Sequence, residues 1–240
     1  MNDGTIMNNP LNRAISSANE AALGVEGVKE FRVMTHSFSA VYGMNMGSQI
    51  TIVTKSGTNQ FHGSLFEFLR NRALDARNWA DRAAKPPFRR NSFGGSLGGP
   101  ITRDRTFFFQ TYEGLRQSRP ITELGTVPTA AARLGDLNGD GVAEVSVDPV
   151  VVPHLRLYPL PNGPDLGQGI GRYSRPVANV QRQEYAQGRL VYNFSDAGSL
   201  FGRYTIDDAK QTTATLNPDV GESLSSRNQY ITLSENQVVS

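Results

Sequence analysis

The chain has 240 residues, of which 38% are hydrophobic, and its 24 lysines and arginines nearly balance its 22 aspartates and glutamates. This even balance argues against nucleic-acid binding, and the local cluster of Arg82, Lys85, Arg89 and Arg90 stands beside two prolines, as in a solvated loop. The absence of cysteine excludes a disulfide framework and a thiolate metal site, and the absence of an apolar run of about 18 residues excludes a helical membrane span.

Residues 49–71 contain two strand-like runs joined by a polar turn at 56–59. The second run, residues 61–71, has no proline and no helical period. It meets the roughly 9 to 11 residues that a strand tilted by about 45° needs to cross a bilayer. A long edge strand of a soluble sheet is the alternative, and the recurrence of such segments favours the membrane.

Further strand-like segments are residues 93–101, 106–116, 184–195 and 200–207, and another begins near Gln229. The connections between them alternate in length. The tight turns are residues 102–105 and 195–198, and the long loops are residues 72–91, 117–183 and 208–228. The long loops far exceed the median of about 4 to 6 residues in compact domains. Short turns on one side and long loops on the other predict an antiparallel transmembrane β-barrel, here only its N-terminal strands.

Side chains alternate along these strands between apolar and polar. In residues 185–194 one face carries Ala186, Gly188, Leu190, Tyr192 and Phe194, and the other carries Gln187, Arg189 and Asn193. Residues 200–207 repeat the pattern less cleanly. A polar lumen and an apolar exterior account for it. Residues 106–112 place aromatics on both faces, which leaves open a strand buried on both sides in a sandwich core or an aromatic belt at the membrane interface.

Several motifs in chain order resemble the TonB-dependent receptor superfamily, especially its Oar-like branch. The motifs lie at residues 28–33, 39–43, 49–59, 61–68, 90–101, 107–109, 112–116, 158–162 and 192–195. The resemblance implies that residues 1–56 are the C-terminal part of a plug domain and that residues 57–240 begin the barrel. In this sequence Val41 stands where such receptors commonly have an acidic residue before the plug tyrosine, here Tyr42.

The resemblance also implies a place in the outer membrane, contact with its lipid, and uptake of an unidentified ligand that outer loops capture. Movement of the plug would be driven through the TonB complex. Neither a TonB-contacting segment nor a signal peptide is recognisable, so we expect a fragment whose contact with TonB lies outside it. An Oar-like outer-membrane protein that works in adhesion or protein export, without nutrient import, fits the same strands.

The glycine-rich stretch at residues 94–100 has two interpretations. Glycine loops can cradle phosphates, but such a loop follows a strand and opens a helix, whereas this one precedes a charged turn and an aromatic strand. Glycine within a strand marks a bend or a close approach of backbones, and the sequence favours that interpretation.

Residues 136–141 copy the opening of a calcium loop, with Asp136, Asn138 and Asp140 at alternate positions and Gly141 at the sixth. The twelfth position, which should supply a bidentate carboxylate, is Val147. The pattern favours a surface turn over a bound calcium ion. A soluble, secreted calcium-binding β-module remains a further alternative for the whole chain.

Catalytic signals are sparse. His36, His62 and His154 lack metal-ligand spacing, and no Gly-x-Ser-x-Gly motif supports a nucleophile. The sequence therefore predicts that the chain is not an enzyme, has no catalytic residues and binds no cofactor. Trp79, the only tryptophan, is expected to anchor residues 78–82 on the rim of the barrel.

Overall fold

The computed structural model describes Asp3, Ala18 and residues 24–35, 49–76, 87–215, 217 and 220–238. Several sequence predictions fall outside these residues. They concern His36, the motif at 39–43 with Val41, Trp79 with residues 78–82, and the basic residues Arg82 and Lys85.

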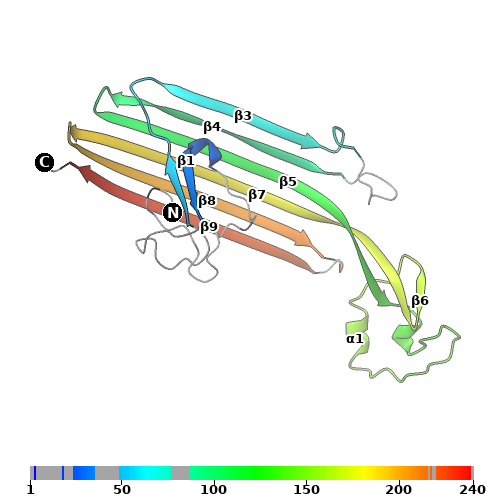
Figure 1. Cartoon of the computed structure of the whole chain (residues 1–240). Helices are drawn as coiled ribbons and strands as arrows, with labels where there is room; N and C mark the ends of the chain where they lie inside the picture. The colour runs from blue at the N-terminus through cyan, green and yellow to red at the C-terminus, as the bar shows by residue number, and fades with distance from the viewer. Residues whose placement is uncertain are drawn as a thin grey trace.

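One large antiparallel sheet dominates the molecule (Figure 1). Its strands lie in chain order, each beside its neighbour in sequence, and the short β6 pairs with β7. The strands are β3 His62–Asn71, β4 Arg89–Thr102, β5 Thr106–Pro128, β6 Asp165–Gly167, β7 Ile170–Ser195, β8 Gly198–Ala214 and β9 Gly221–Gln237. Within the described residues β3 and β9 are the two edges and do not pair with each other, so the sheet is open. The predicted mainly β fold, with a partial barrel, is confirmed.

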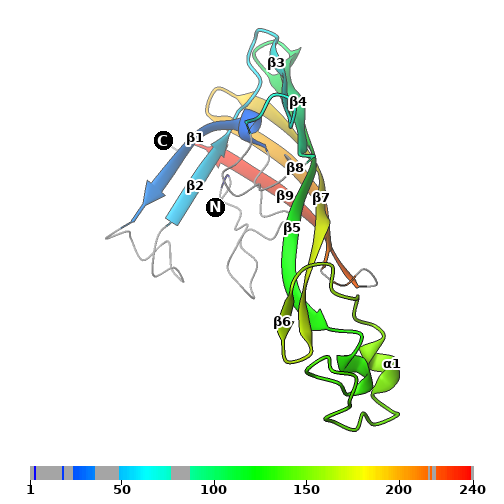
Figure 2. The same ribbon diagram turned by 90° about the vertical axis from the view of Figure 1, so that its right-hand side faces the viewer.

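A second, two-stranded sheet precedes the large one. The short 3-10 helix η1, Val25–Gly27, leads into β1, Val28–Met34, which pairs antiparallel with β2, Gln49–Thr54. Figure 2 shows this pair, hereafter the hairpin, on one side of the curved large sheet. We call the face of the large sheet toward the hairpin the inner face, and the opposite face the outer face.

Both predicted tight turns are present at the same end of the sheet. Thr102 pairs with Thr106, and Ser195 pairs with Gly198. Asp104 takes a left-handed backbone conformation with φ of 63°. The connections at the opposite end are longer, so the alternation predicted from the sequence is confirmed (Figure 1).

The long loops are shorter than predicted because the strands extend into them. Residues 117–128 and 170–181, assigned to one loop from the sequence, pair with each other in continuous register. Beyond Ser118 and Asn179 these strands pair only with each other, except where the short β6 pairs with β7 at Ile170 and Gly171, so they form a two-stranded ribbon. Pro120 and Pro176 are compatible with it, because each ribbon strand has a free edge where no N–H is needed.

The other two loops are corrected in the same way. The predicted loop at 208–228 shrinks to residues 215–220, since β8 and β9 pair up to Ala214 and Gly221. The predicted loop at 72–91 ends where β4 begins at Arg89, so Arg89 and Arg90 lie in a strand and not in a loop.

The ribbon carries a small irregular unit at its tip, residues 129–169. It contains the 3-10 helix η3, Ala132–Leu134, and the single-turn helix α1, Val152–Leu155. In the described part of the chain no helix has the length and apolar character to cross a membrane.

The two faces of the large sheet differ sharply in chemistry. The outer face exposes large apolar side chains, such as Leu65 at 93% and Leu233 at 75%. The inner face buries polar ones, including Gln183, Thr205 and Arg203. The aromatic run divides between the faces, because Phe109 is buried on the inner side while Tyr112, across from Ala186, stays 45% exposed on the outer side. Neither interpretation left open by the sequence describes the whole run.

Substitution of two neighbours on β9 tests these faces. Leu233→Arg places a charge on the outer face, where lipid is expected, and should lower the free energy of unfolding by about 2 to 4 kcal/mol. Ser234→Arg points to the polar inner face and should change it by less than about 0.5 kcal/mol. Urea unfolding in lipid vesicles, followed by heat-modifiable gel mobility, measures both. Equal losses in the two variants would contradict the assignment of faces.

Candidate functional site

The hairpin meets the inner face at a buried ionic cluster. The carboxylate of Asp3 accepts hydrogen bonds from Arg203 at 2.8 Å, Arg189 at 3.2 Å and the Thr54 hydroxyl at 2.6 Å. The side chains of Asp3 and Arg203 are 5% and 1% exposed. Arg203 also donates to the Thr232 hydroxyl at 2.9 Å. The cluster therefore joins Asp3 and β2 to β7, β8 and β9.

The register of the sheet explains why an anion is needed there. Arg189 and Arg203 are direct partners on β7 and β8, so two guanidinium groups stand side by side on the inner face. Like charges directly opposite on a sheet are destabilising, and buried charges need partners. Asp3 supplies one negative charge between them. The Phe201 ring lies 4.1 Å from the Arg189 guanidinium and adds a cation–π contact.

A second polar contact centres on Glu26 in η1. Its backbone N–H donates to the Glu113 carboxylate of β5 at 2.9 Å. Its own carboxylate accepts a hydrogen bond from Ser64 of β3 at 2.7 Å and lies 4.0 Å from the Lys55 ammonium. Ser64 lies in turn 2.9 Å from Ser96 of β4. Glu26 thus joins the segment before the hairpin to three further strands.

Gly27 lies between these two contacts and lets the segment before the hairpin approach the large sheet, hereafter the wall. A Cβ atom at Gly27 would lie 3.1 Å from the Thr111 methyl group and 3.2 Å from the Gln187 amide nitrogen. A side chain at this position would therefore require the side chains of Thr111 and Gln187 to shift by a few tenths of an ångström. The absent side chain lets the backbone of η1 lie directly against β5 and β7.

The arrangement is a polar interface between two parts of the chain. Its polar contacts are hydrogen bonds and ion pairs, which water can replace when the surfaces separate. A packed apolar interface would instead resist separation, because opening it exposes hydrophobic surface. The chemistry suits a contact that can open and close again.

The predicted calcium-loop residues come together at the tip of the ribbon. Carboxylate oxygens of Asp136, Asp140 and Glu144 lie within 4.8 Å of one another. These groups already serve the turn, because Asp136 accepts the N–H groups of Gly139 and Gly141 at 2.6 and 2.9 Å. Asn138 donates to Asp140 at 3.1 Å. The turn's own hydrogen bonds account for the cluster.

The remaining sequence candidates lie apart from one another. His62 begins β3, with its ring centroid 6.3 Å from that of Phe109, whereas His154 belongs to α1 in the tip. The glycine-rich stretch at 94–100 lies inside β4, paired on both sides. It is therefore a strand with close backbone contacts and not a phosphate loop.

Sequence reasoning missed Asp3, Glu26 and Glu113. Gln187 and Arg189 were placed correctly on the polar face by the alternation along residues 185–194. Asp3 and Glu26 lie in segments without periodicity, so no pattern predicted their partners. Two arginines at facing positions of adjacent strands were a usable signal, since they require an anion from elsewhere in the chain.

Comparisons with known proteins agree with this geometry. A family model described as "Outer membrane beta barrel domain" matches residues 53–240, which begin inside β2 and include the whole large sheet. Over 114 residues the sequence is 30% identical to the TonB-dependent transporter Oar of Myxococcus xanthus. That alignment covers 45% of this chain and 10% of the relative, so the chain spans about a tenth of the length of this curated relative. No solved structure matches.

A double-mutant cycle tests the ionic cluster. Asp3→Ala leaves two guanidinium groups without their anion and should lower the free energy of unfolding by about 3 to 5 kcal/mol. The double variant Asp3→Ala with Arg203→Met should lose about 1 to 3 kcal/mol less free energy of unfolding than the two single variants lose in sum. Urea unfolding measures each variant.

The exposed pair Arg227 and Asp208 is the matched control. Its side chains are 66% and 40% exposed, and the same cycle should give a coupling below about 1 kcal/mol. A coupling at Asp3 no larger than this would mean that the cluster does not hold the hairpin.

Proposed function

The chain belongs to the outer membrane β-barrel family, and we propose that it is the part of a TonB-dependent transporter in which the plug ends and the barrel begins. Its place is the outer membrane. The observation that carries the proposal is the hairpin held to the inner face through Asp3 and Glu26. In this proposal residues 1–56 belong to the plug, and the chain carries out no bond chemistry and binds no cofactor or nucleic acid.

The inner-face contacts suggest how such a plug could move. Asp3 and Glu26 fix the hairpin through directional polar bonds, and each bond can be exchanged for water as a channel opens. The energy would come from the TonB complex through a segment outside this sequence. The barrel wall would stay in place, because its strands are joined by continuous ladders.

Ligand capture is proposed for the long connections. The strands that these connections join, at residues 72–88, 129–169 and 215–220, meet them at the end of the sheet opposite the tight turns. Rigid strands commonly present binding segments in this way.

A second candidate function is adhesion or protein export by an outer-membrane protein of the same architecture. The ribbon favours it, because about ten residues of β5 and β7 continue past their neighbours, or roughly 33 Å at about 3.3 Å per residue. Such a projection suits contact with another surface or chain. The outer-membrane location leaves no place for the alternative of a soluble, secreted calcium-binding module.

A disulfide between the hairpin segment and the wall tests import. Gly27→Cys with Thr111→Cys suits the distance, since a Cβ atom at residue 27 would lie 3.1 Å from the Thr111 methyl. The chain has no other cysteine. Mass spectrometry of the medium first identifies the solutes that wild-type cells consume and a deletion strain does not. Cells that carry the oxidised variant should take up these solutes no better than the deletion strain does. Reductant should restore uptake.

The matched control is Gln181→Cys with Gln211→Cys, which joins two neighbouring strands of the large sheet on the same face. It should leave uptake unchanged. If wild-type and deletion strains consume the same solutes, import is not the function. Loss of uptake in both disulfide variants would mean that cross-linking itself, and not a fixed plug, is the cause.

Removal of the tip tests the second candidate. Val127 pairs with Gly171, so an Asn-Gly turn can replace residues 128–170 without disturbing the ladder below. Heat-modifiable mobility should be preserved. Under the adhesion interpretation, surface attachment of the cells falls at least tenfold, whereas the same turn in place of residues 215–220 leaves attachment unchanged. Unchanged attachment without the tip would reject that interpretation.

A further inference from the structure

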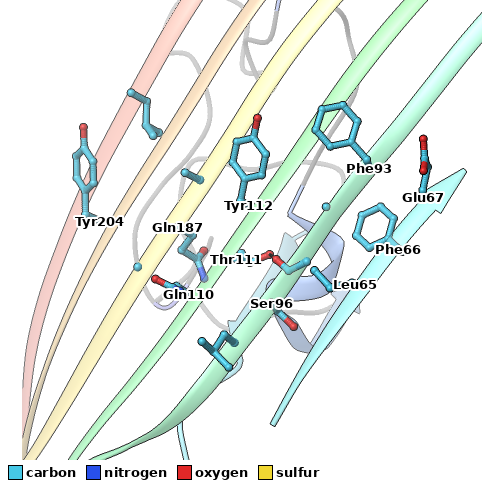
Figure 3. A pocket seen from close by; sticks show the side chains of 16 residues that line it. Leu65, Phe66, Glu67, Phe93, Ser96, Gln110, Thr111, Tyr112, Gln187 and Tyr204 are labelled. Carbon is cyan, nitrogen blue, oxygen red and sulfur yellow. Dashed lines mark hydrogen bonds between the residues drawn. The ribbon is translucent and has the colours of Figure 1, made fainter. Parts of the chain in front are cut away.

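The ribbon of β5 and β7 differs from the wall because its strands leave their other neighbours. Within the wall β5 lies between β4 and β7, as Figure 3 shows at Thr111, which has Ser96 of β4 on one side and Gln187 of β7 on the other. Both edges of β5 are paired there. Beyond Ser118 the ladder with β4 stops, and β5 continues with β7 alone (Figure 1). An open strand edge offers its N–H and C=O groups to another strand.

The β7 edge of the ribbon is closed by residues of the tip. The N–H of Arg172 donates to the Pro164 carbonyl at 2.9 Å, and the Arg172 carbonyl accepts the Asn162 N–H at 3.1 Å. The Asn162 side chain bonds the N–H and the C=O of Ser174, at 2.8 and 2.7 Å. Pro176 follows at the next position of the same edge and has no N–H. These positions of β7 therefore offer no free donor to a further strand.

The β5 edge is open over the matching stretch. In an antiparallel pair a residue points both its N–H and its C=O either toward the partner strand or away from it, and the residue opposite does the same. Arg172 and Ser174 direct theirs away from β5. Their partners Thr126 and Leu124 therefore point away from β7, and Thr122 follows by the period of two. In the part of the chain that the structure describes, nothing bonds to the backbone of these three residues of β5.

This open edge is short and has prolines at both ends. The side chains of Thr122, Leu124 and Thr126 are exposed and uncharged. Pro120 and Pro128 hold the next outward positions on either side, and neither has an N–H. Exposed strand edges are commonly protected by a charged side chain or a bulge, and this edge has neither at its outward positions. It therefore suits pairing with one short strand.

The open edge is complementary to a second copy of itself. With a two-fold axis at Leu124, an antiparallel copy places Leu124 opposite Leu124 and Thr122 opposite Thr126. Every free N–H and C=O of the three outward residues then has a partner. Threonine pairs across strands are favourable. Glu123 lies opposite Gly125 of the other copy, so no two carboxylates face each other.

The neighbouring registers are less favourable. An axis at Glu123 would place two carboxylates directly opposite each other, which is destabilising. An axis at Gly125 would place the Thr122 carbonyl against Pro128, which has no N–H to donate. The residues of this edge therefore select the register centred on Leu124.

We propose that the protein self-associates through its ribbon, with residues 122–126 of two copies paired antiparallel about a two-fold axis at Leu124. The two ribbons then form one continuous sheet, in which the β5 strands meet at the centre. A contact of this size is weak between dilute molecules, and confinement in a membrane supplies the local concentration that it needs. The pairing depends on the ribbon alone and holds whether the protein imports a ligand or binds a surface.

A cysteine on the axis tests the pairing, because the chain has no other cysteine. Residues that exchange both hydrogen bonds across an antiparallel pair have Cα atoms about 5.5 Å apart, which suits a disulfide. The variant Leu124→Cys, oxidised mildly in the outer membrane of cells that express the full-length protein, should give a linked dimer on a non-reducing gel.

Thr122→Cys is the matched control for exposure. In the proposed register the two copies of residue 122 are offset by four residues, or about 14 Å at about 3.4 Å per residue, which is too far for a disulfide. This variant should give at least tenfold less dimer. Expressed together with Thr126→Cys, it should give at least fivefold more dimer than either variant alone, because residues 122 and 126 are opposite each other in this register.

A proline at the edge tests the hydrogen bonds. Added to Leu124→Cys, Thr126→Pro removes an N–H that the ladder with β7 does not use, and it should reduce the dimer at least tenfold. Thr126→Ala removes the same hydroxyl but keeps the N–H, and it should change the yield less than twofold. Heat-modifiable mobility shows that each variant is folded.

Three results would overturn the proposal. The first is equal dimer from Leu124→Cys and Thr122→Cys, which would indicate random collision. The second is a Leu124→Cys dimer that Thr126→Pro leaves unchanged. The third is a disulfide from Leu124→Cys to a different protein, without the dimer. None of these readouts depends on uptake or attachment, so failure here is distinct from failure of either proposed function.

Discussion

Backbone hydrogen bonding in hydrocarbon is the constraint on which the rest of this structure depends. Each N–H and C=O group at membrane depth must be paired within the protein, and long antiparallel ladders achieve this without a helix. The ladders impose a period of two, so neighbouring residues face lipid and lumen in turn. Gln187, Gly188 and Arg189 illustrate the result, because the first and third meet the hairpin side while the second lies on the outer face.

The polar inner face creates a further requirement. Two arginines in register on adjacent strands are not stable neighbours unless an anion lies between them, and the strands themselves supply none at that position. Asp3 meets the requirement from a distant part of the chain, with Thr54 of β2 beside it. The wall and the segment inside it are thus electrostatically complementary. The wall would be less stable without that segment, which ties the fold of the sheet to what it encloses.

Sequence patterns predicted the features that follow from the period of two. The strand centres, both tight turns, the polar and apolar faces and the outer-membrane class were all accessible. The ribbon could not be predicted, since residues such as Pro120 and Pro176 indicate a loop. A ribbon that extends beyond the rest of the sheet also needs no apolar face, so its sequence shows no clear alternation. The anions Asp3 and Glu26 were missed because their contacts join segments far apart in sequence. Such pairings depend on the folded arrangement and not on local spacing.

The same turn that sets the register also holds the segment leaving the hairpin. A slip of one residue would exchange the lipid and lumen faces of a strand, so the turn at residues 102–105 fixes which side chains reach the hairpin. Asn59 bonds twice to Asp104 in that turn, at 2.6 and 2.8 Å. Gly57, two residues before Asn59, lies against the carbonyl groups of Gly99 and Phe108. Residues 57–59 are therefore attached to the wall, and any displacement of the hairpin must bend the chain upstream of Gly57.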